Sequence, residues 1–236
     1  MKPNQTCWAV IPAAGIGTRM GAEIPKQYLP LMGKTVLEHT ALRFCEQVDI
    51  RGVVVVLADN DRHWKKLSLA ANPKIHTTTG GIQRYHSVFN GLRYLENMAS
   101  VDDWVLVHDA ARPCIRTEDI NKLIQAAVSS ADGAVLAIPE RDTMKRATRD
   151  KKIESTVSRD DLWHAQTPQM FRFSMLKSAL ENVFAKNIPV TDESQAIEIF
   201  GKFPMLVEGH ADNIKITHPA DLMLAEVYLK QQEYRL

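Results

Sequence analysis

The sequence has few cysteines, and they follow no recognised pattern. Cys7, Cys45 and Cys114 are widely spaced along 236 residues and form no CxxC pair. An odd number of scattered cysteines favours free thiols in a reducing compartment over a disulfide framework or a zinc site. The 8 histidines show no HExxH spacing, so none of them is assigned to a metal. We therefore expect a cytoplasmic protein.

Long apolar runs and excess charge of one sign are also missing. The apolar run 8–14 is short and is broken by Pro12, so no signal peptide is expected. The run 53–58 is too short to span a membrane and is typical of a buried parallel strand. The chain has 29 Lys and Arg against 28 Asp and Glu, a formal charge of +1. Such a balance favours neither nucleic acid nor an anionic membrane as a partner.

Two common phosphate-binding motifs are absent as well. A dinucleotide-binding GxGxxG turn has Gly or Ala at its sixth position, and here Met20 stands there. A P-loop needs GxxxxGK followed by Ser or Thr, and the sequence has no such run. A phosphate site in this chain must therefore be of another kind.

A glycine-rich segment near the N-terminus has the composition of such a site. Gly15, Gly17 and Arg19 follow a short apolar strand, and Pro25 then precedes Lys26. Glycines let backbone N–H groups approach an anion closely, and two cations in the same loop suit a polyphosphate. The alternative is an ordinary strand-to-helix turn with a surface arginine and lysine. The composition favours the phosphate site. The pattern, a Gly-rich loop ending in Arg and then Pro-Lys, resembles the signature of nucleotidyltransferases that build activated sugars and alcohols.

Apolar runs alternate with helical patterns along most of the chain. Strands are expected at 7–11, 52–58, 74–78, 105–108, 133–138, 162–170 and 205–208. Helices are expected at 35–46, 84–97, 118–129 with Thr117 as N-cap, 174–186, 193–200 and 219–232. This alternation predicts an α/β fold of one domain, 1–236, with a mostly parallel, Rossmann-like sheet flanked by helices. Ligands of such sheets bind at the carboxyl ends of the strands.

Residues 139–158 interrupt the alternation with a polar, mostly basic stretch. One interpretation is a solvated surface loop. The other is a protruding arm, a β-hairpin that meets a partner subunit. Acidic residues are interspersed and aromatic residues are missing, which argues against nucleic-acid binding.

A second candidate motif follows the strand near residue 107. Asp109 at a strand's carboxyl end is placed to hold Mg²⁺ on a nucleotide phosphate, although a turn or helix-capping aspartate is the common alternative. Arg112 would hold a phosphate or Asp109 itself. His108 is interpreted as a packed strand-end residue and not as a catalyst.

Six segments in one order give a narrower resemblance. They are 12–27, 108–113, 141–145, 163–169, 191–193 and 212–217. Together they resemble the 2-C-methyl-D-erythritol 4-phosphate cytidylyltransferases of non-mevalonate isoprenoid biosynthesis, over nearly the whole chain. The resemblance implies CTP and a polyol phosphate as substrates, Mg²⁺ as cofactor, and a homodimer whose arms cross between subunits.

The resemblance also implies roles for single residues. Arg19, Lys26 and Lys215 match catalytic cations, and Asp109 matches a metal-side carboxylate. The implied nucleotide-binding residues are Ala13, Ala14, Gly15, Gly17, Gly80, Gly81 and Ser87. The implied substrate-binding residues are Arg112, Thr143, Arg159 and Thr167. Ile82 departs from the acidic residue usual in the family, so it is not assigned to the site.

Each of these residues also has a structural interpretation. Thr143 and Thr167 would be strand residues, Arg159 would pair with a neighbouring aspartate, and Lys215 and Ser87 would lie on the surface. Asp192 and Glu193 would cap the next helix, although the family motif at 191–193 also allows them a ligand-side role.

Three rival functions remain open from the sequence. The nearest is a ribitol 5-phosphate cytidylyltransferase, which shares the fold and most motifs. A non-catalytic nucleotide-binding subunit is disfavoured by the intact Arg19, Lys26, Asp109 and Lys215. A glycosyltransferase would need an Asp-x-Asp metal motif; the segment 59–61 has that form, but it is interpreted as the start of a charged helix.

Overall fold

The computed structural model describes residues 6–15 and 24–233. Its strands are β1 (Cys7–Pro12), β2 (Pro30–Leu31), β3 (Lys34–Thr35), β4 (Ile50–Leu57), β5 (Ile75–Thr79), β6 (Trp104–Val107), β7 (Ala134–Pro139), β8 (Met144–Ala147), β9 (Ile153–Val157), β10 (Trp163–Arg172) and β11 (Met205–Glu208). Its α-helices are α1 (Val36–Cys45), α2 (Arg84–Leu95), α3 (Thr117–Ser129), α4 (Phe173–Ala185), α5 (Glu193–Ile199) and α6 (Pro219–Glu233). Short 3-10 helices are η2 (Lys26–Tyr28), η3 (Trp64–Lys66) and η4 (Ser68–Ala71).

Seven strands form the central sheet in the order β11-β7-β10-β6-β1-β4-β5. The pairs β1–β4, β1–β6, β4–β5 and β7–β11 are parallel, and β10 runs antiparallel between β6 and β7. The predicted α/β fold with a mostly parallel sheet is therefore confirmed.

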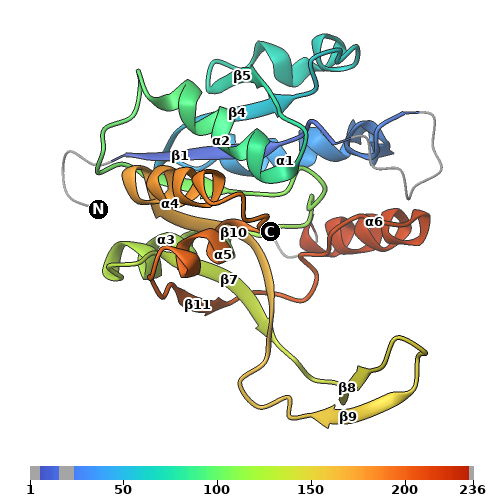
Figure 1. The fold of residues 1–236 in the computed structure, drawn as a ribbon. Coiled ribbons are helices and arrows are strands. Elements are labelled where there is room, and N and C mark those ends of the chain that lie inside the picture. The colour runs from blue at the N-terminus through green and yellow to red at the C-terminus, as the bar shows by residue number, and fades with distance from the viewer. Residues whose placement is uncertain (1–5, 16–23, 234–236) are drawn as a thin grey trace.

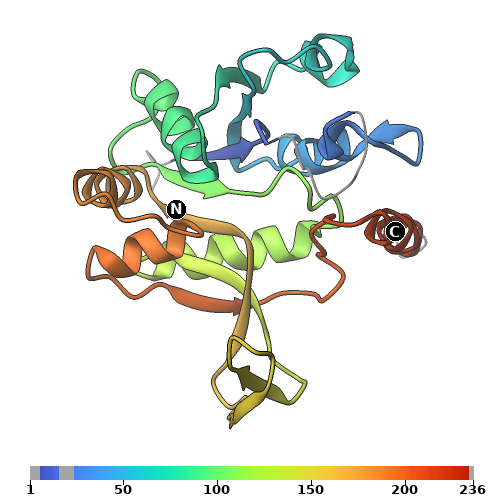
Figure 2. The same ribbon diagram turned by 45° about the vertical axis from the view of Figure 1, so that its right-hand side comes forward.

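Helices cover both faces of this sheet because alternate strand residues point to opposite sides (Figures 1 and 2). One face packs against α1 and α3, through residues such as Leu37 and Leu123. The other face packs against α2, α4 and α5, where Leu92 and Leu176 are fully buried. Helix α6 packs at the side, through Ala225 and Leu229.

Strands β8 and β9 form a separate two-stranded hairpin that projects from the body as an arm (Figures 1 and 2). Its chain leaves the sheet at the end of β7 and returns at the start of β10. Every residue from 141 to 156 is exposed. The predicted hairpin is confirmed; the segment is solvated, as the alternative of a surface loop expects, but its two halves pair as strands.

Most predicted elements begin and end within two residues of the observed ones, but the cap of α3 was misplaced. Thr117 is the first helical residue, and Arg116 is the N-cap and makes no side-chain cap hydrogen bond. The Arg116 side chain instead donates to Asp212 and Glu118.

All three cysteines are buried free thiols, as expected. Among the described residues, no helix is long and apolar enough to cross a membrane.

Candidate active site

The ends of three parallel strands meet at one edge of the sheet and enclose a cavity of about 270 Å³. Strand β1 leads into the glycine-rich loop, β5 into Gly80 and Gly81, and β6 into His108 and Asp109. The cavity is lined by Pro12, Ala13, Ala14, Gly15, Lys26, Gln27, Gly81, Ile82, Gln83, Arg84, Ser87, Asp109, Ala110, Ala111 and Lys215. Most of the predicted site residues therefore lie around one cavity.

The described part of the glycine-rich loop is held by a buried glutamine. The Gln27 side-chain amide donates to the carbonyl oxygens of Ala13, at 2.6 Å, and Gly15, at 2.9 Å. Lys26 Nζ donates to the Ile216 carbonyl at 2.6 Å, which joins this loop to the segment before α6. Gln27 was not among the predicted site residues, although it follows directly after Lys26. Gly17 and Arg19 lie outside the described residues.

The loop between β5 and α2 packs tightly against the glycine-rich loop. A Cβ atom on Gly80 would lie 2.5 Å from the Ala14 Cβ and 2.8 Å from Ser87 Oγ, so only glycine fits there. The Gly81 amide donates to Ser87 Oγ at 3.1 Å. Ser87 is buried, so its interpretation as a surface residue is wrong. Ile82 is 98% exposed and stands at the rim of the cavity.

Asp109 lies at the centre of a cluster of cations. Arg84 Nε approaches Oδ1 at 2.8 Å, and Lys215 Nζ and Arg112 Nε approach Oδ2 at 2.9 and 3.3 Å. Burial alone would raise the pKa of Asp109, but the charges of Arg84, Lys215 and Arg112 outweigh it and hold the pKa well below the ordinary value. Asp109 is therefore ionised. Lys215 is exposed, as its interpretation as a surface lysine expects, but it is also paired with Asp109.

A chain of hydrogen bonds behind Asp109 fixes its backbone. The Asp109 amide donates to Thr167 Oγ1 at 3.1 Å, and that hydroxyl lies 3.0 Å from His108 Nδ1. His108 Nε2 lies 3.1 Å from the Arg112 carbonyl, which can only accept, so Nε2 carries the proton and Nδ1 accepts from Thr167. Burial lowers the pKa of His108 to about 4. His108 is thus a neutral packed residue, as predicted.

Arg84 and Glu193 belong to this cluster. The sequence did not point to Arg84 as part of the site, whereas the family motif at 191–193 left a ligand-side role open for Glu193. Arg84 Nη1 and Nη2 bind the two carboxylate oxygens of Glu193 at 2.7 and 3.1 Å. Asp192 caps α5 as predicted, because its side chain accepts from the Gln195 amide. Glu193, however, is fully buried against Arg84. No local motif marks an arginine at the start of α2 as the partner of two carboxylates elsewhere in the chain.

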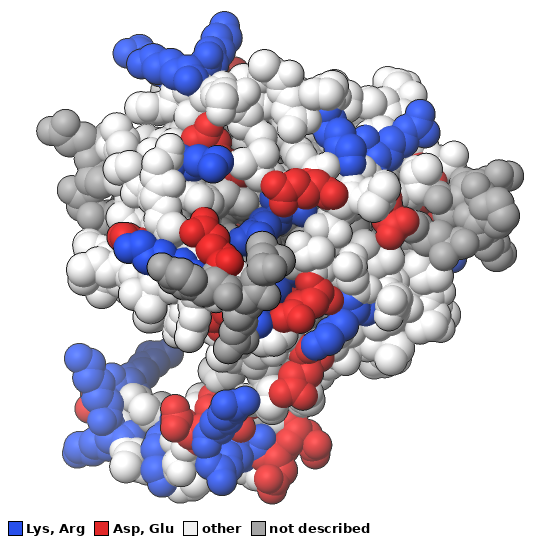
Figure 3. Space-filling model, turned by 180° about the vertical axis from the view of Figure 1, so that it is seen from behind, with Lys and Arg blue, Asp and Glu red and all other residues white. Residues whose placement is uncertain are grey.

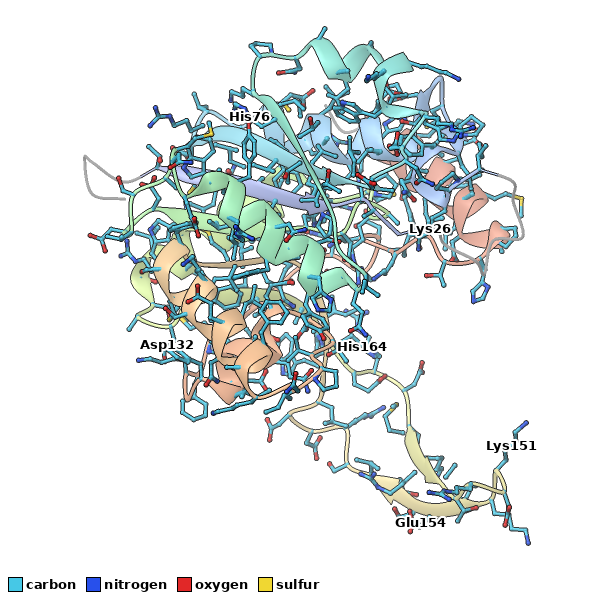
Figure 4. All side chains as sticks on the ribbon, turned by 45° about the horizontal axis from the view of Figure 1, so that its top comes forward. Lys26, His76, Asp132, Lys151, Glu154 and His164 are labelled. Atoms are coloured by element: carbon cyan, nitrogen blue, oxygen red, sulfur yellow. The ribbon has the colours of Figure 1, made fainter. Side chains whose placement is uncertain are left out.

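Two predicted substrate residues lie on or beside the arm and do not line the cavity. Thr143 precedes β8 and is exposed. Arg159 donates to the Arg141 carbonyl, and no ion pair joins it to Asp160 or Asp161 in the described structure. Figure 4 shows Lys26 on the body, His164 where the arm joins it, and Lys151 and Glu154 far out on the arm.

The segment 59–61 forms no metal motif of a glycosyltransferase. Asp61 Oδ1 accepts from the amides of His63 and Trp64 at the start of η3, and Oδ2 accepts from the Tyr28 hydroxyl. It is a capping aspartate, as expected, but the helix that follows is a short 3-10 turn.

The glycine-rich loop at a strand end, with lysines and an ionised carboxylate around one cavity, defines a nucleotidyltransferase on an α/β sheet. Residues 7–231 match the family model described as 2-C-methyl-D-erythritol 4-phosphate cytidylyltransferase. The chain belongs to this family, which confirms the resemblance found in the sequence.

Proteins with the same name as the family match this chain over nearly their full lengths. The protein of that name from Vibrio vulnificus (strain CMCP6) is 48% identical over 227 residues, which cover 96% of each chain. The one from Tolumonas auensis is 50% identical and covers 97% of this chain and 99% of its own. The crystal structure of the Francisella tularensis protein superposes with a TM-score of 0.83 at 37% identity, covering 95% of this chain and 100% of the other. The crystal structure of the Thermus thermophilus protein superposes with a TM-score of 0.79 at 32% sequence identity, and the match covers 96% of this chain and 100% of the other.

Proposed function

We propose that this cytidylyltransferase joins CTP and 2-C-methyl-D-erythritol 4-phosphate at the cavity described above. The products are 4-diphosphocytidyl-2-C-methyl-D-erythritol and pyrophosphate, a step of non-mevalonate isoprenoid biosynthesis. The family match over residues 7–231 is the observation that carries this function. The position of Lys26, Asp109 and Lys215 around one cavity supports it.

The chemistry asks for charge stabilisation more than for proton transfer. A phosphate oxygen of the substrate attacks the α-phosphorus of CTP, and the bond to pyrophosphate breaks. The attacking phosphomonoester is largely a dianion at neutral pH, so it needs no general base. The buried, neutral His108 fits a site without a catalytic histidine. Cations that offset the growing negative charge then make the main contribution.

The proposed roles follow the sequence positions. Lys26 and Lys215, with Arg19, are the cations for the triphosphate and the transition state. The nucleotide lies along Ala13, Ala14, Gly15, Gly17, Gly80, Gly81 and Ser87. Arg112 and Thr167 do not line the cavity and are bonded within their own chain, and they are proposed as substrate-side residues that act next to Asp109. Thr143 and Arg159 on the arm are proposed to reach the polyol phosphate, in the neighbouring subunit of a dimer.

A divalent cation, Mg²⁺, is proposed as the cofactor. Among residues 6–15 and 24–233 no group of three or more His, Cys, Asp or Glu side chains is arranged to hold a metal. Asp109 is the acidic side chain among the described residues lining the cavity. Mg²⁺ usually keeps several waters and takes one or two carboxylates together with substrate phosphates, so an ionised Asp109 fits a metal that arrives with the nucleotide. When bound, the metal would neutralise phosphate charge.

A homodimer through the arm is also proposed. An isolated two-stranded hairpin is marginally stable in water, yet β8 and β9 pair at a distance from the sheet. The arm exposes apolar side chains, among them Ile153, which is 70% exposed, and many basic ones (Figure 3). Both features fit a surface that docks on a second copy. A cytoplasmic location is inferred from the free cysteines.

The test compares pyrophosphate release from CTP with two acceptors. The protein is incubated with Mg²⁺ and either 2-C-methyl-D-erythritol 4-phosphate or ribitol 5-phosphate. Release with the first and little with the second is the expected result. Release only with ribitol 5-phosphate would overturn the substrate, and no release with either from folded protein would overturn the activity.

A further inference from the structure

The two oxygens of the Asp109 carboxylate have different kinds of partner. Oδ1 accepts from Arg84 Nε at 2.8 Å. Oδ2 receives Lys215 Nζ at 2.9 Å and, at a longer 3.3 Å, Arg112 Nε. The Lys215 side chain is 40% exposed and lines the cavity, so it can turn towards a bound phosphate.

The Arg84 side chain cannot turn away from Asp109 as Lys215 can, because its other two nitrogens are hydrogen-bonded to Glu193. Nη1 and Nη2 hold both oxygens of Glu193, a fork-to-fork geometry that fixes the plane of the guanidinium. The Glu193 side chain is 0% exposed.

The start of α5, which carries Glu193, is itself fixed from behind. The Gln169 side chain donates to Asp192 Oδ2 at 2.9 Å and accepts from the Ser194 amide at 2.8 Å. Glu193 is therefore held by its helix, and Arg84 is held by Glu193.

We propose that Arg84 is a positioning residue for cytidylyl transfer: anchored on buried Glu193, it clamps Oδ1 of Asp109 and leaves Oδ2 as the oxygen at which ligands exchange. The proposal rests on the proposed function, since it assigns Asp109 to the reaction. It adds two residues, Arg84 and Glu193, which are 109 positions apart in the sequence. Arg84 acts through Asp109 and need not touch the substrate.

The clamp explains how Lys215 can move away from Asp109 without leaving that carboxylate unpaired. Three cations and two carboxylates give the cluster a formal charge of +1, which suits a polyanionic nucleotide. When Lys215 moves to a phosphate, Arg84 and Arg112 still neutralise Asp109. The carboxylate therefore keeps its place while one of its partners is exchanged.

The test is a double-mutant comparison on the full chain. Glu193→Gln keeps the shape of the side chain and removes its charge. We expect kcat to fall about tenfold in the otherwise unchanged protein, as is typical for partners behind a functional ligand. In an Asp109→Asn background the same change should lower kcat by less than about twofold, because the clamp then has no carboxylate to hold. An equal loss in both backgrounds, or no loss in either, overturns the proposal.

A second pair of variants covers the case in which Asp109→Asn is too slow or fails to fold. Arg84→Lys keeps one charge but not the fork. If both residues act as one clamp, the Arg84→Lys/Glu193→Gln double variant loses no more kcat than the worse single variant. If instead the fold-losses in kcat of the two single variants multiply in the double variant, the proposal is overturned.

Two further measurements separate positioning from general damage. CTP binding in the presence of a chelator should change less than about twofold in Glu193→Gln, because the Gly81–Ser87 contact does not involve the clamp. Asp103→Asn is the matched control. Asp103 is a buried carboxylate that accepts hydrogen bonds from Thr6 and Trp8 near the amino ends of β1 and β6, whereas the cavity lies at the carboxyl ends of these strands. It should lower stability and leave kcat unchanged. If the unmodified protein transfers no CMP from CTP, the proposed function is refuted. If it transfers CMP normally but Glu193→Gln lowers kcat equally in the unmodified and Asp109→Asn backgrounds, only the clamp is refuted.

Discussion

Lys26 and Lys215 approach the cavity from opposite ends of the sequence. The Lys26 Nζ bond to the Ile216 carbonyl, one residue after Lys215, brings the two segments together. This contact explains why widely separated motifs form one site. The composition of the loop predicts Lys26, and the family resemblance predicts Lys215, as a cation of a phosphate site, but neither indicates that Lys215 is paired with Asp109.

Lys26→Ala tests the proposed electrostatic role of this residue. We expect kcat to fall about 100-fold or more, because a preorganised charge in the site is lost. The lost bond to Ile216 involves a charged donor and should cost about 2 kcal/mol of stability. Steady-state kinetics and thermal unfolding are measured together, with Lys34→Ala in the exposed strand β3 as the control. Unchanged turnover from folded Lys26→Ala protein would refute the assignment.

Asp103 should make the stability of the fold depend on pH. Burial raises its pKa, but hydrogen bonds from Thr6, Ser100 and Trp8 outweigh burial and lower the pKa below the ordinary value. A carboxyl with a lowered folded pKa stabilises the protein above its unfolded pKa of about 3.9, and this stabilisation is lost as the pH falls through the folded pKa.

The measurement is urea unfolding of the unchanged protein and of Asp103→Asn at pH 7 and pH 3. Asp103→Asn should lower the free energy of unfolding by about 2 kcal/mol at pH 7, the range for hydrogen bonds to a charged group. The difference between the two proteins should shrink at pH 3. A difference that is the same at both pH values would show that the charge of Asp103 does not contribute.

At the scale of elements, local patterns were sufficient for the sheet and its covering helices. Runs of β-branched residues such as 53–56 indicate buried strands, and apolar spacing indicates the helices. The segment between β4 and β5 was harder to predict. Only Trp64 and Leu69 are buried there, so no helical stripe develops and the chain forms two short 3-10 turns. The Arg84–Glu193 pair could not be predicted, because it depends on how α2 and α5 pack.

Gly91→Ala tests the packing of α2 on the sheet. Alanine favours a helix over glycine by about 1 kcal/mol. A Cβ atom at position 91 would, however, lie 2.6 Å from Val10 Cγ1 and 3.1 Å from Val56 Cγ2, within a dense core. Overpacking of this kind typically costs about 1–3 kcal/mol, so a net loss of stability is expected.

Chemical denaturation measures this loss, and Val10→Ala provides the control. In the Val10→Ala background the space beside Gly91 is enlarged, so Gly91→Ala should then be neutral or stabilising. Destabilisation of the same size in both backgrounds would mean that the contact with Val10 is not the cause.

At the scale of the whole molecule, the arm should be separable from the body. Residues 145–156 are all exposed, and strands β8 and β9 pair with each other. We expect a variant in which a short Gly-Ser linker replaces them to be monomeric and still folded, since the core is untouched. Light scattering after size-exclusion chromatography gives the mass. A variant that is still a dimer would refute association through the arm.

Strand β10 connects the foot of the arm with the site. It pairs with β7 from Trp163 and, within the same strand, places Thr167 against the Asp109 amide. The pairing of β10 with β7 is regular from Trp163 to Ala165, is irregular up to Gln169 and then continues, so Thr167 lies in the irregular part of the strand. Added residues near the turn at 148–152 would lengthen the hairpin and leave Thr167 in place. Residues added between Trp163 and Thr167 would disturb the segment that holds this hydroxyl against the Asp109 amide. The arm is therefore free to differ in length at its tip but not at its foot.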